Sequence, residues 1–350
     1  MDLRVKTYLS EDHRLHFPQA EIYGGEFVTP FERPSRVEYV LRRLRERGFA
    51  EPEAPDEIDM GPVEMVHDAG YLSFLETVWD EWVAAGFKGE VVATAFPARR
   101  MQTTRVPTDI DGRVGYYALA AETMITAGTW AAARASCATA QAAVRDVLDG
   151  ARAAFALCRP PGHHAARDMY GGYCFLNNAA VAAAMLRATH ERVAVLDVDF
   201  HHGNGTQDIF YSRPDVLFAS LHGDPENTFP YFLGYADEQG EEAGEGANLN
   251  LPLPPGTAWE RWSAALDEAL AAVAEHGAGA LVVSLGTDAF EADPISTFKL
   301  TSDDFAAMGE RIAGAGLPTV FAMEGGYAIE AVGVNAVNVL EGFGPVNGGG

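Results

Sequence analysis

Apolar residues follow two periods along the chain, one typical of buried strands and one typical of amphipathic helices. Short apolar runs predict strands covered on both faces, and helical spacing of apolar residues predicts the helices that cover them. We expect strands at 2–9, 153–158, 192–200, 216–222, 280–286 and 319–325, with an edge strand at 247–253. We expect helices at 35–47, 71–85, 118–148 with an interruption near Gly128, 177–189, 258–276, 302–314 and 329–343.

Strands and helices alternate from about residue 150 onward, which is typical of an α/β protein with a mostly parallel sheet and helices on both faces. The sequence contains no internal repeat and no low-complexity linker. We therefore predict a single domain over 1–343 and a flexible tail at 344–350. Residues 87–115 depart from the pattern, with several prolines and many polar residues. Loops of this length are usually functional or interfacial, so we predict an insert loop there.

The stretch 193–205, VAVLDVDFHHGNG, changes from an apolar strand to polar residues and glycine. Ligands bind at the carboxyl ends of strands in open α/β sheets. Side chains two residues apart on a strand point the same way, so Asp199 and His201 can face one point, with Asp197 one step behind. A carboxylate and an imidazole that converge favour a divalent metal, zinc first. The alternative for this motif alone is a capping Asp and a hydrogen-bonded His.

Three other predicted strands also end in polar residues. These residues are Asp288 after ALVVSLG, Tyr327 within MEGGY, and His163 with His164 within RPPGHH. Each feature alone has an ordinary explanation as a cap or a surface residue, but four such clusters at one edge of a sheet indicate a site. Asp199, His201 and Asp288 would supply three ligands and leave positions for water and substrate, which is typical of a catalytic metal.

The chain carries 25 Lys and Arg against 50 Asp and Glu, a net charge of −25. Such a surface repels nucleic acid and anionic membranes and attracts cations, although acidity also serves solubility alone. Cys137, Cys158 and Cys174 are odd in number and lack CxxC spacing, which argues against disulfides and a cysteine zinc site. The first residues lack the apolar run of a signal peptide, and no apolar run is long enough to span a membrane. We therefore expect a cytoplasmic protein.

Five motifs in order resemble the motif series of the histone deacetylase family. They are RPPGHH, GGYCFLNN, DVDFHHGNG, a strand that ends before Asp288, and EGGY. Within this family the chain is most similar to bacterial acetylpolyamine amidohydrolases, with EIYGGEF and PTDIDG as further similarities. The resemblance implies an arginase–deacetylase fold with a single eight-stranded, mostly parallel sheet. It also implies a zinc-dependent amidohydrolase that removes acetyl groups from acetylated polyamines and releases acetate and a free amine.

The resemblance implies a role for each site residue. Zinc would bind to Asp199, His201 and Asp288, His164 would be the general base and acid, His163 would contribute electrostatically or shuttle protons, and Tyr327 would donate its hydroxyl to the oxyanion. Asp197 would pair with His163, and Asn204 would stand behind His164, where many family members have Asp. A neutral amide fixes the imidazole tautomer without stabilising imidazolium, so we expect a neutral His164 near pH 7.

The family also uses structural potassium beside the zinc site and an aromatic substrate tunnel. By resemblance, potassium would involve Asp197, Asp199, His201, Ser220 and Leu221. The tunnel would be lined by Gly172, Tyr173 and Phe229. Some polyamine-selective relatives carry a glutamate after an Asp-Pro pair, but here Ile295 follows Pro294. We therefore assign recognition of the substrate's ammonium groups to Glu21, Asp111 and Glu122, with a solvated surface carboxylate as the alternative for each.

The length and irregularity of the insert at 87–115, together with the resemblance, predict a homodimer in which the insert contacts the partner and narrows the active-site entrance. The alternative for this segment is a mobile surface loop. Three alternatives for the function stay open. A protein-lysine deacetylase would use the same chemistry. An arginase-like binuclear hydrolase would need further metal-binding carboxylates, whereas His202 and Gly203 follow His201. A non-catalytic acetyl-group binder should have lost Tyr327 or a metal ligand, and this chain has all of them.

Overall fold

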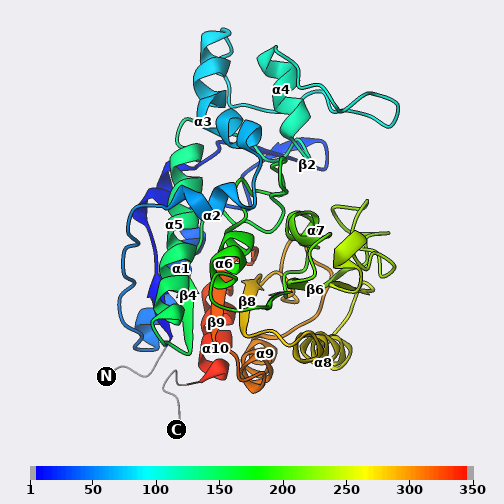
Figure 1. Ribbon diagram of the computed structural model, residues 1–350. Helices are drawn as coiled ribbons and strands as arrows, with labels where there is room; N and C mark the ends of the chain where they lie inside the picture. Colours follow the sequence, from blue (N-terminus) through cyan, green and yellow to red (C-terminus); the bar gives the residue numbers. More distant parts are fainter. Residues whose placement is uncertain (1–4, 345–350) are drawn as a thin grey trace.

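The computed structural model describes residues 5–344 and is built on a seven-stranded sheet with helices on both faces (Figure 1). The strand order is β1-β4-β9-β8-β5-β6-β7, and all neighbours in this sheet are parallel. A separate antiparallel hairpin pairs β2 with β3. The strands are β1 (Lys6–Tyr8), β2 (Glu21–Tyr23), β3 (Glu26–Val28), β4 (Ala153–Ala156), β5 (Val193–Asp197), β6 (Val216–Gly223), β7 (Asn248–Leu253), β8 (Ala280–Leu285) and β9 (Thr319–Met323).

Ten α-helices and two short 3-10 helices lie within the described residues. They are η1 (Glu11–Leu15), α1 (Ser35–Glu46), α2 (Met60–Glu64), α3 (Ala69–Ala84), α4 (Ile110–Tyr117), α5 (Thr129–Leu148), α6 (Asn178–Leu186), α7 (Asn204–Phe210), η2 (Glu242–Gly244), α8 (Trp259–His276), α9 (Ser302–Gly314) and α10 (Val332–Phe343). Local sequence fixes several ends. The Asp68 side chain caps the first turn of α3, and Gly277 ends α8 in the left-handed conformation. Across the described part of the chain, none of these helices is long and apolar enough to cross a membrane.

Side chains alternate between the two faces of the sheet, and each face has its own core. Ala154 and Ala156 of β4 pack with α2 to α7, whereas Ala153 and Phe155 pack with α1, α8, α9 and α10. All five residues of the interior strand β5 are buried. This burial on both faces explains why the strands are continuous apolar runs in the sequence.

The predicted fold class, the parallel sheet and its covering helices are confirmed, with three differences. The sheet has seven strands within residues 5–344 rather than eight. Residues 118–128 are not helical, because α5 begins only at Thr129. The hairpin β2–β3 and the helices α2, α4 and α7 have three to eight residues each, too few to show a period in the sequence. The tail predicted at 344–350 lies, apart from Gly344, outside the described residues.

The segment 87–115 is partly built into the core. Val91 and Val114 are fully buried, and α4 already begins at Ile110. The longest stretch of this segment that is exposed throughout is 94–109, which projects from the body of the molecule beside α4 (Figure 1). The insert predicted at 87–115 therefore combines buried anchoring residues with a long exposed stretch.

Candidate metal centre and active site

The residues singled out at the ends of strands meet at one edge of the sheet. The carboxyl ends of β4, β9, β8 and β5 lie side by side there, because these strands are neighbours and parallel. From β5 the chain continues outward through β6 and β7, and then returns to the other side of β5 with β8 and β9. Such a reversal of strand order opens a crevice at the carboxyl edge, where ligands bind in open α/β sheets.

Asp199, His201 and Asp288 form a buried group whose potential ligand atoms all lie within 4.8 Å of one another. His201 Nδ1 lies 2.9 Å from Asp288 Oδ2 and 3.4 Å from Asp199 Oδ1. Ligands of a tetrahedral zinc ion, at bond lengths of about 2.0–2.2 Å, are about 3.3 Å apart, so this spacing fits zinc. The structure thus brings together the three ligands predicted from the sequence.

Charge crowding explains why this group suits a cation. Burial raises the pKa of Asp288, and the adjacent Asp199 carboxylate raises it further, to about 8. Burial disfavours the imidazolium form of His201, but its bonds to the two carboxylates outweigh burial and raise its pKa to about 10. Both shifts favour the protonated forms, and a proton on His201 offsets part of the carboxylate charge. A divalent cation can take the place of these protons, because metal ligands bind in their deprotonated forms.

The two adjacent histidines have different partners. His163 Nδ1 lies 3.0 Å from Asp197 Oδ2, and although burial disfavours its charged form, the nearby carboxylates raise its pKa to about 10. His164 Nδ1 lies 2.6 Å from Asn204 Oδ1. Burial and the neighbouring imidazoles hold the pKa of His164 well below its usual value. His164 is thus a neutral imidazole at pH 7, in line with its amide partner.

Asp293 positions the loop that carries Tyr327, a role that no sequence motif indicated. Asp293 Oδ2 accepts the backbone N–H groups of Tyr327 at 2.6 Å and Ala328 at 3.1 Å. Burial keeps the pKa of the Tyr327 phenol well above its usual value. The phenol therefore keeps its proton at neutral pH and can act as a hydrogen-bond donor.

A buried ion-pair network behind Tyr327 was also missed by sequence reasoning. Arg36 donates to the two backbone carbonyls that flank Gly325, at 2.7 and 2.5 Å, and its guanidinium carbon lies 5.0 Å from the centre of the Tyr327 ring. Glu32 bridges Arg36 at 3.1 Å and Arg159 at 2.9 Å. Arg36 and Arg159 thus share the Glu32 carboxylate, and these contacts tie the Tyr327 loop to the loop after β4.

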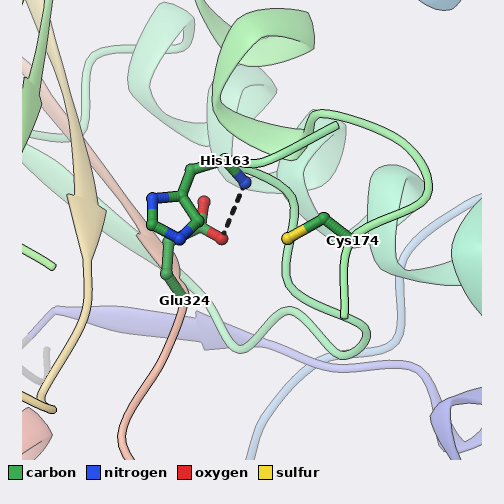
Figure 2. Close-up of side chains that lie close together, drawn as sticks. All are labelled: His163, Cys174 and Glu324. Carbon is green, nitrogen blue, oxygen red and sulfur yellow. Dashed lines mark hydrogen bonds between the residues drawn. The ribbon is translucent and has the colours of Figure 1, made fainter. Parts of the chain in front are cut away.

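A second cluster of potential metal ligands lies beside the first and consists of His163, Cys174 and Glu324, all buried (Figure 2). Glu324 Oε2 accepts the backbone N–H of Gly162 at 2.6 Å and that of His163 at 3.1 Å. Both ring nitrogens of His163 already face carboxylates outside this cluster, at 3.0 and 3.8 Å. We therefore interpret Glu324 as a support that fixes the backbone carrying the two histidines.

A cavity of about 500 Å³ gives access to the site. Its wall contains His164, His201, Tyr327, Gly172, Tyr173, Phe229, Phe200, Glu122, Ile22, Tyr23, Gly24, Asn227, Thr228, Tyr231 and residues 294–297. All three predicted tunnel residues line it. The ring centres of Phe229 and His164 are 5.2 Å apart. Position 172 requires glycine, since an added Cβ would lie 2.1 Å from His164 Cδ2 and φ is +54°.

The three carboxylates predicted to bind ammonium groups occupy different places. Glu122 lines the cavity and accepts the Gly172 N–H at 3.2 Å. Glu21 is buried and accepts the hydroxyl of Tyr173 at 3.1 Å, and its burial raises its pKa to about 7. Asp111 lies in the first turn of α4, bonded to Thr94, and is not part of the cavity wall. Within one chain, only Glu122 is positioned to meet a substrate directly.

A group of three potential metal ligands beside a neutral imidazole and a buried phenol is the arrangement of a metal-dependent hydrolase. The sequence pattern of the histone deacetylase domain matches residues 30–343, and the chain belongs to the histone deacetylase family. This membership identifies a hydrolytic deacetylase.

Close relatives cover almost the whole chain. An acetylpolyamine amidohydrolase of Mycoplana ramosa is 55% identical over 339 residues, which cover 97% of this chain and 99% of the relative. Acetylpolyamine amidohydrolase 1 of Pseudomonas aeruginosa is 55% identical over 336 residues, with coverage of 95% and 97%. The crystal structure of an acetylpolyamine aminohydrolase from Burkholderia pseudomallei matches with a TM-score of 0.92 at 42% identity, over 98% of this chain and all of that one.

The buried Glu324 carboxyl should make stability depend on pH. Burial raises its pKa from 4.5 to about 7. The folded state therefore binds more protons than the unfolded state, and the free energy of unfolding falls as pH rises through this window. The side chain of Glu324→Gln cannot titrate, so this variant should not lose that stability. We expect the free energy of unfolding of the variant, minus that of the unmodified protein, to rise by on the order of 1–3 kcal/mol from about pH 5 to about pH 8. Urea unfolding at the two pH values measures this change.

The exposed Glu64→Gln serves as the matched control and should show no such trend. A stability difference between Glu324→Gln and the unmodified protein that is the same at both pH values would contradict the prediction.

Proposed function

We propose that this protein is a zinc-dependent amidohydrolase that removes the acetyl group from acetylated polyamines and releases acetate and a free amine. One observation carries the proposal: His201, His164 and Tyr327 face a single cavity whose described wall contains no Lys or Arg. A cationic substrate meets no like charge there, apart from the histidines of the site itself. The name acetylpolyamine amidohydrolase, which relatives at 55% identity carry, supports the same substrate class.

The chain's own residues would perform the proton transfers. When bound by Asp199, His201 and Asp288, zinc would polarise the amide carbonyl and lower the pKa of a water molecule. Because Asn204 holds Nδ1 of His164, Nε2 would accept the proton of the attacking water and later give it to the leaving amine. Tyr327 would donate its O–H to the carbonyl oxygen as negative charge develops there. His163, paired with Asp197, would supply positive charge beside the reacting groups.

We also propose the potassium site implied by the family resemblance. Its residues are Asp197, Asp199, His201, Ser220 and Leu221, which are all buried. Asp197 and Ser220 are register partners on the adjacent strands β5 and β6, so the proposed ligands lie together. A monovalent cation there would offset part of the carboxylate charge behind the metal centre.

The substrate class is tested by comparing a monoacetylated diamine, a neutral N-alkylacetamide of equal length and an acetyllysine peptide on the zinc-loaded protein. We expect the acetylated diamine to have the highest kcat/KM. Asp288→Ala should lose both bound zinc and activity, whereas Tyr327→Phe should keep zinc and lose about 10²–10³ in kcat. Zinc analysis and acetate release measure these outcomes. A higher kcat/KM on the acetyllysine peptide would instead identify a protein deacetylase.

Asn204 should set the acidic limb of the pH profile. A carboxylate beside His164 Nδ1 would stabilise its imidazolium form and raise its pKa, so the base would lose its proton only at higher pH. We therefore expect Asn204→Asp to shift the acidic limb of kcat/KM to higher pH and to lower activity more at pH 6 than at pH 8. Asn204→Ala, which adds no charge, is the comparison. An acidic limb that stays in place in Asn204→Asp would argue against His164 as the base.

We propose that residues 94–109, the exposed part of the insert, contact a second copy of the chain in a homodimer. This stretch exposes Phe96, Met101 and Val106 on a projecting loop, and apolar side chains exposed together can form an interface with another chain. Met101→Glu with Val106→Glu should give a monomer by analytical ultracentrifugation without loss of secondary structure. Met65→Glu is the control, because Met65 lies outside the insert and its exposed fraction, 57%, is between those of Met101 and Val106. A doubly substituted protein that remains dimeric would exclude this interface.

A further inference from the structure

Two exposed tyrosines stand in the wall of the cavity, outside the groups that the mechanism uses. Tyr231 follows β6 and Tyr23 ends β2, so they come from separate segments. Their side chains are 49% and 50% exposed, although they line the cavity. Large aromatic side chains that are exposed at a binding cavity offer a flat ring face to a ligand without first being uncovered.

Tyr231 is held in a backbone conformation that residues other than glycine rarely adopt, with φ at +65°. Its backbone N–H donates to the Thr228 carbonyl at 3.0 Å, and its carbonyl accepts the Tyr235 hydroxyl at 2.9 Å. Its ring lies edge-on to Phe229, with centres 6.4 Å apart. Asn or Gly would suit this backbone better than a bulky ring, so the loop keeps an aromatic ring at a position that local geometry disfavours.

Away from the metal centre, the charged side chains in the described wall of the cavity are acidic only. Glu122 lines the same cavity, and no Lys or Arg does so within the described residues. A cation that extends from the metal centre toward the solvent therefore passes a carboxyl group and aromatic side chains. Ring faces attract ammonium groups through the quadrupole of the π-system, including quaternary ammonium groups that cannot donate hydrogen bonds.

We propose that Tyr231, with Tyr23, forms a cation–π subsite that binds an ammonium group of the substrate beyond the acetylated nitrogen. This inference rests on the proposed polyamine substrate and adds the residues that read its charge. Tyr231 touches the substrate and determines specificity, but takes no part in proton transfer. The ring faces provide attraction without the strict geometry of a salt bridge, so the subsite accepts amines of different spacing.

The test measures kinetics of Tyr231→Leu on three acetylated amines of equal length. One ends in a primary ammonium, one in a trimethylammonium and one in a neutral methyl group. We expect kcat/KM to fall about three- to tenfold for both cations, through KM, and to change less than about twofold for the neutral amide. Tyr231→Phe keeps the ring and should behave like the unmodified protein. Tyr23→Leu should also lower kcat/KM for the cations more than for the neutral amide, but by a smaller factor than Tyr231→Leu.

Phe232→Leu is the matched control, because Phe232 is the neighbouring aromatic residue, is 86% exposed and does not line the cavity. The subsite is excluded if Tyr231→Leu lowers kcat/KM equally for cationic and neutral amides, or lowers it for none of them. It is also excluded if Phe232→Leu lowers kcat/KM for the cations alone. The proposed function fails separately, if the unmodified protein prefers the acetyllysine peptide or fails to distinguish the cationic from the neutral amide.

Discussion

The burial of three carboxylates at one edge of the sheet is the constraint on which the rest of this structure depends. Asp197, Asp199 and Asp288 are fully buried, and buried charges are costly unless they are paired and hydrogen-bonded. Backbone N–H groups meet part of this need: Asp199 Oδ2 accepts from Gly325 at 2.8 Å and Asp288 Oδ1 from Phe200 at 2.7 Å. Histidines supply part of the remainder, and a bound cation would supply the rest.

Glycine makes this close approach of backbone to carboxylate feasible. A Cβ added to Gly203 would lie 2.2 Å from Asp197 Oδ2, and one added to Gly286 would lie 2.2 Å from Asp199 Oδ2. A Cβ at Gly325 would come within 2.6 Å of Asp199 Oδ2. The glycines around the motifs are therefore needed by the carboxylates more than by the turns in which they occur.

The sequence predicted the parts of the site that lie at strand ends, and missed the parts that support them. Asp199 and His201 could be placed together because the two-residue period of a strand and the carboxyl-edge rule apply to any parallel sheet. Asp293, Arg36 and Glu324 act through bonds to backbone atoms of segments far away in sequence, and no local period reports such bonds. The eighth strand came from the family resemblance, whereas the short elements were too brief to leave a pattern.

The one-signed charge of the cavity wall has a consequence for the end of the reaction. Hydrolysis turns a neutral amide into a carboxylate and an amine that is protonated at neutral pH, since an alkyl ammonium has a pKa of about 10. The amine product thus carries one more positive charge than the substrate, while acetate carries a negative one. A wall with Glu122 and exposed tyrosine faces, and without Lys or Arg in its described part, favours the first product and disfavours the second. The wall therefore repels acetate, which favours its release. The same wall attracts the polycationic amine product, so tighter binding of the substrate also slows release of this product.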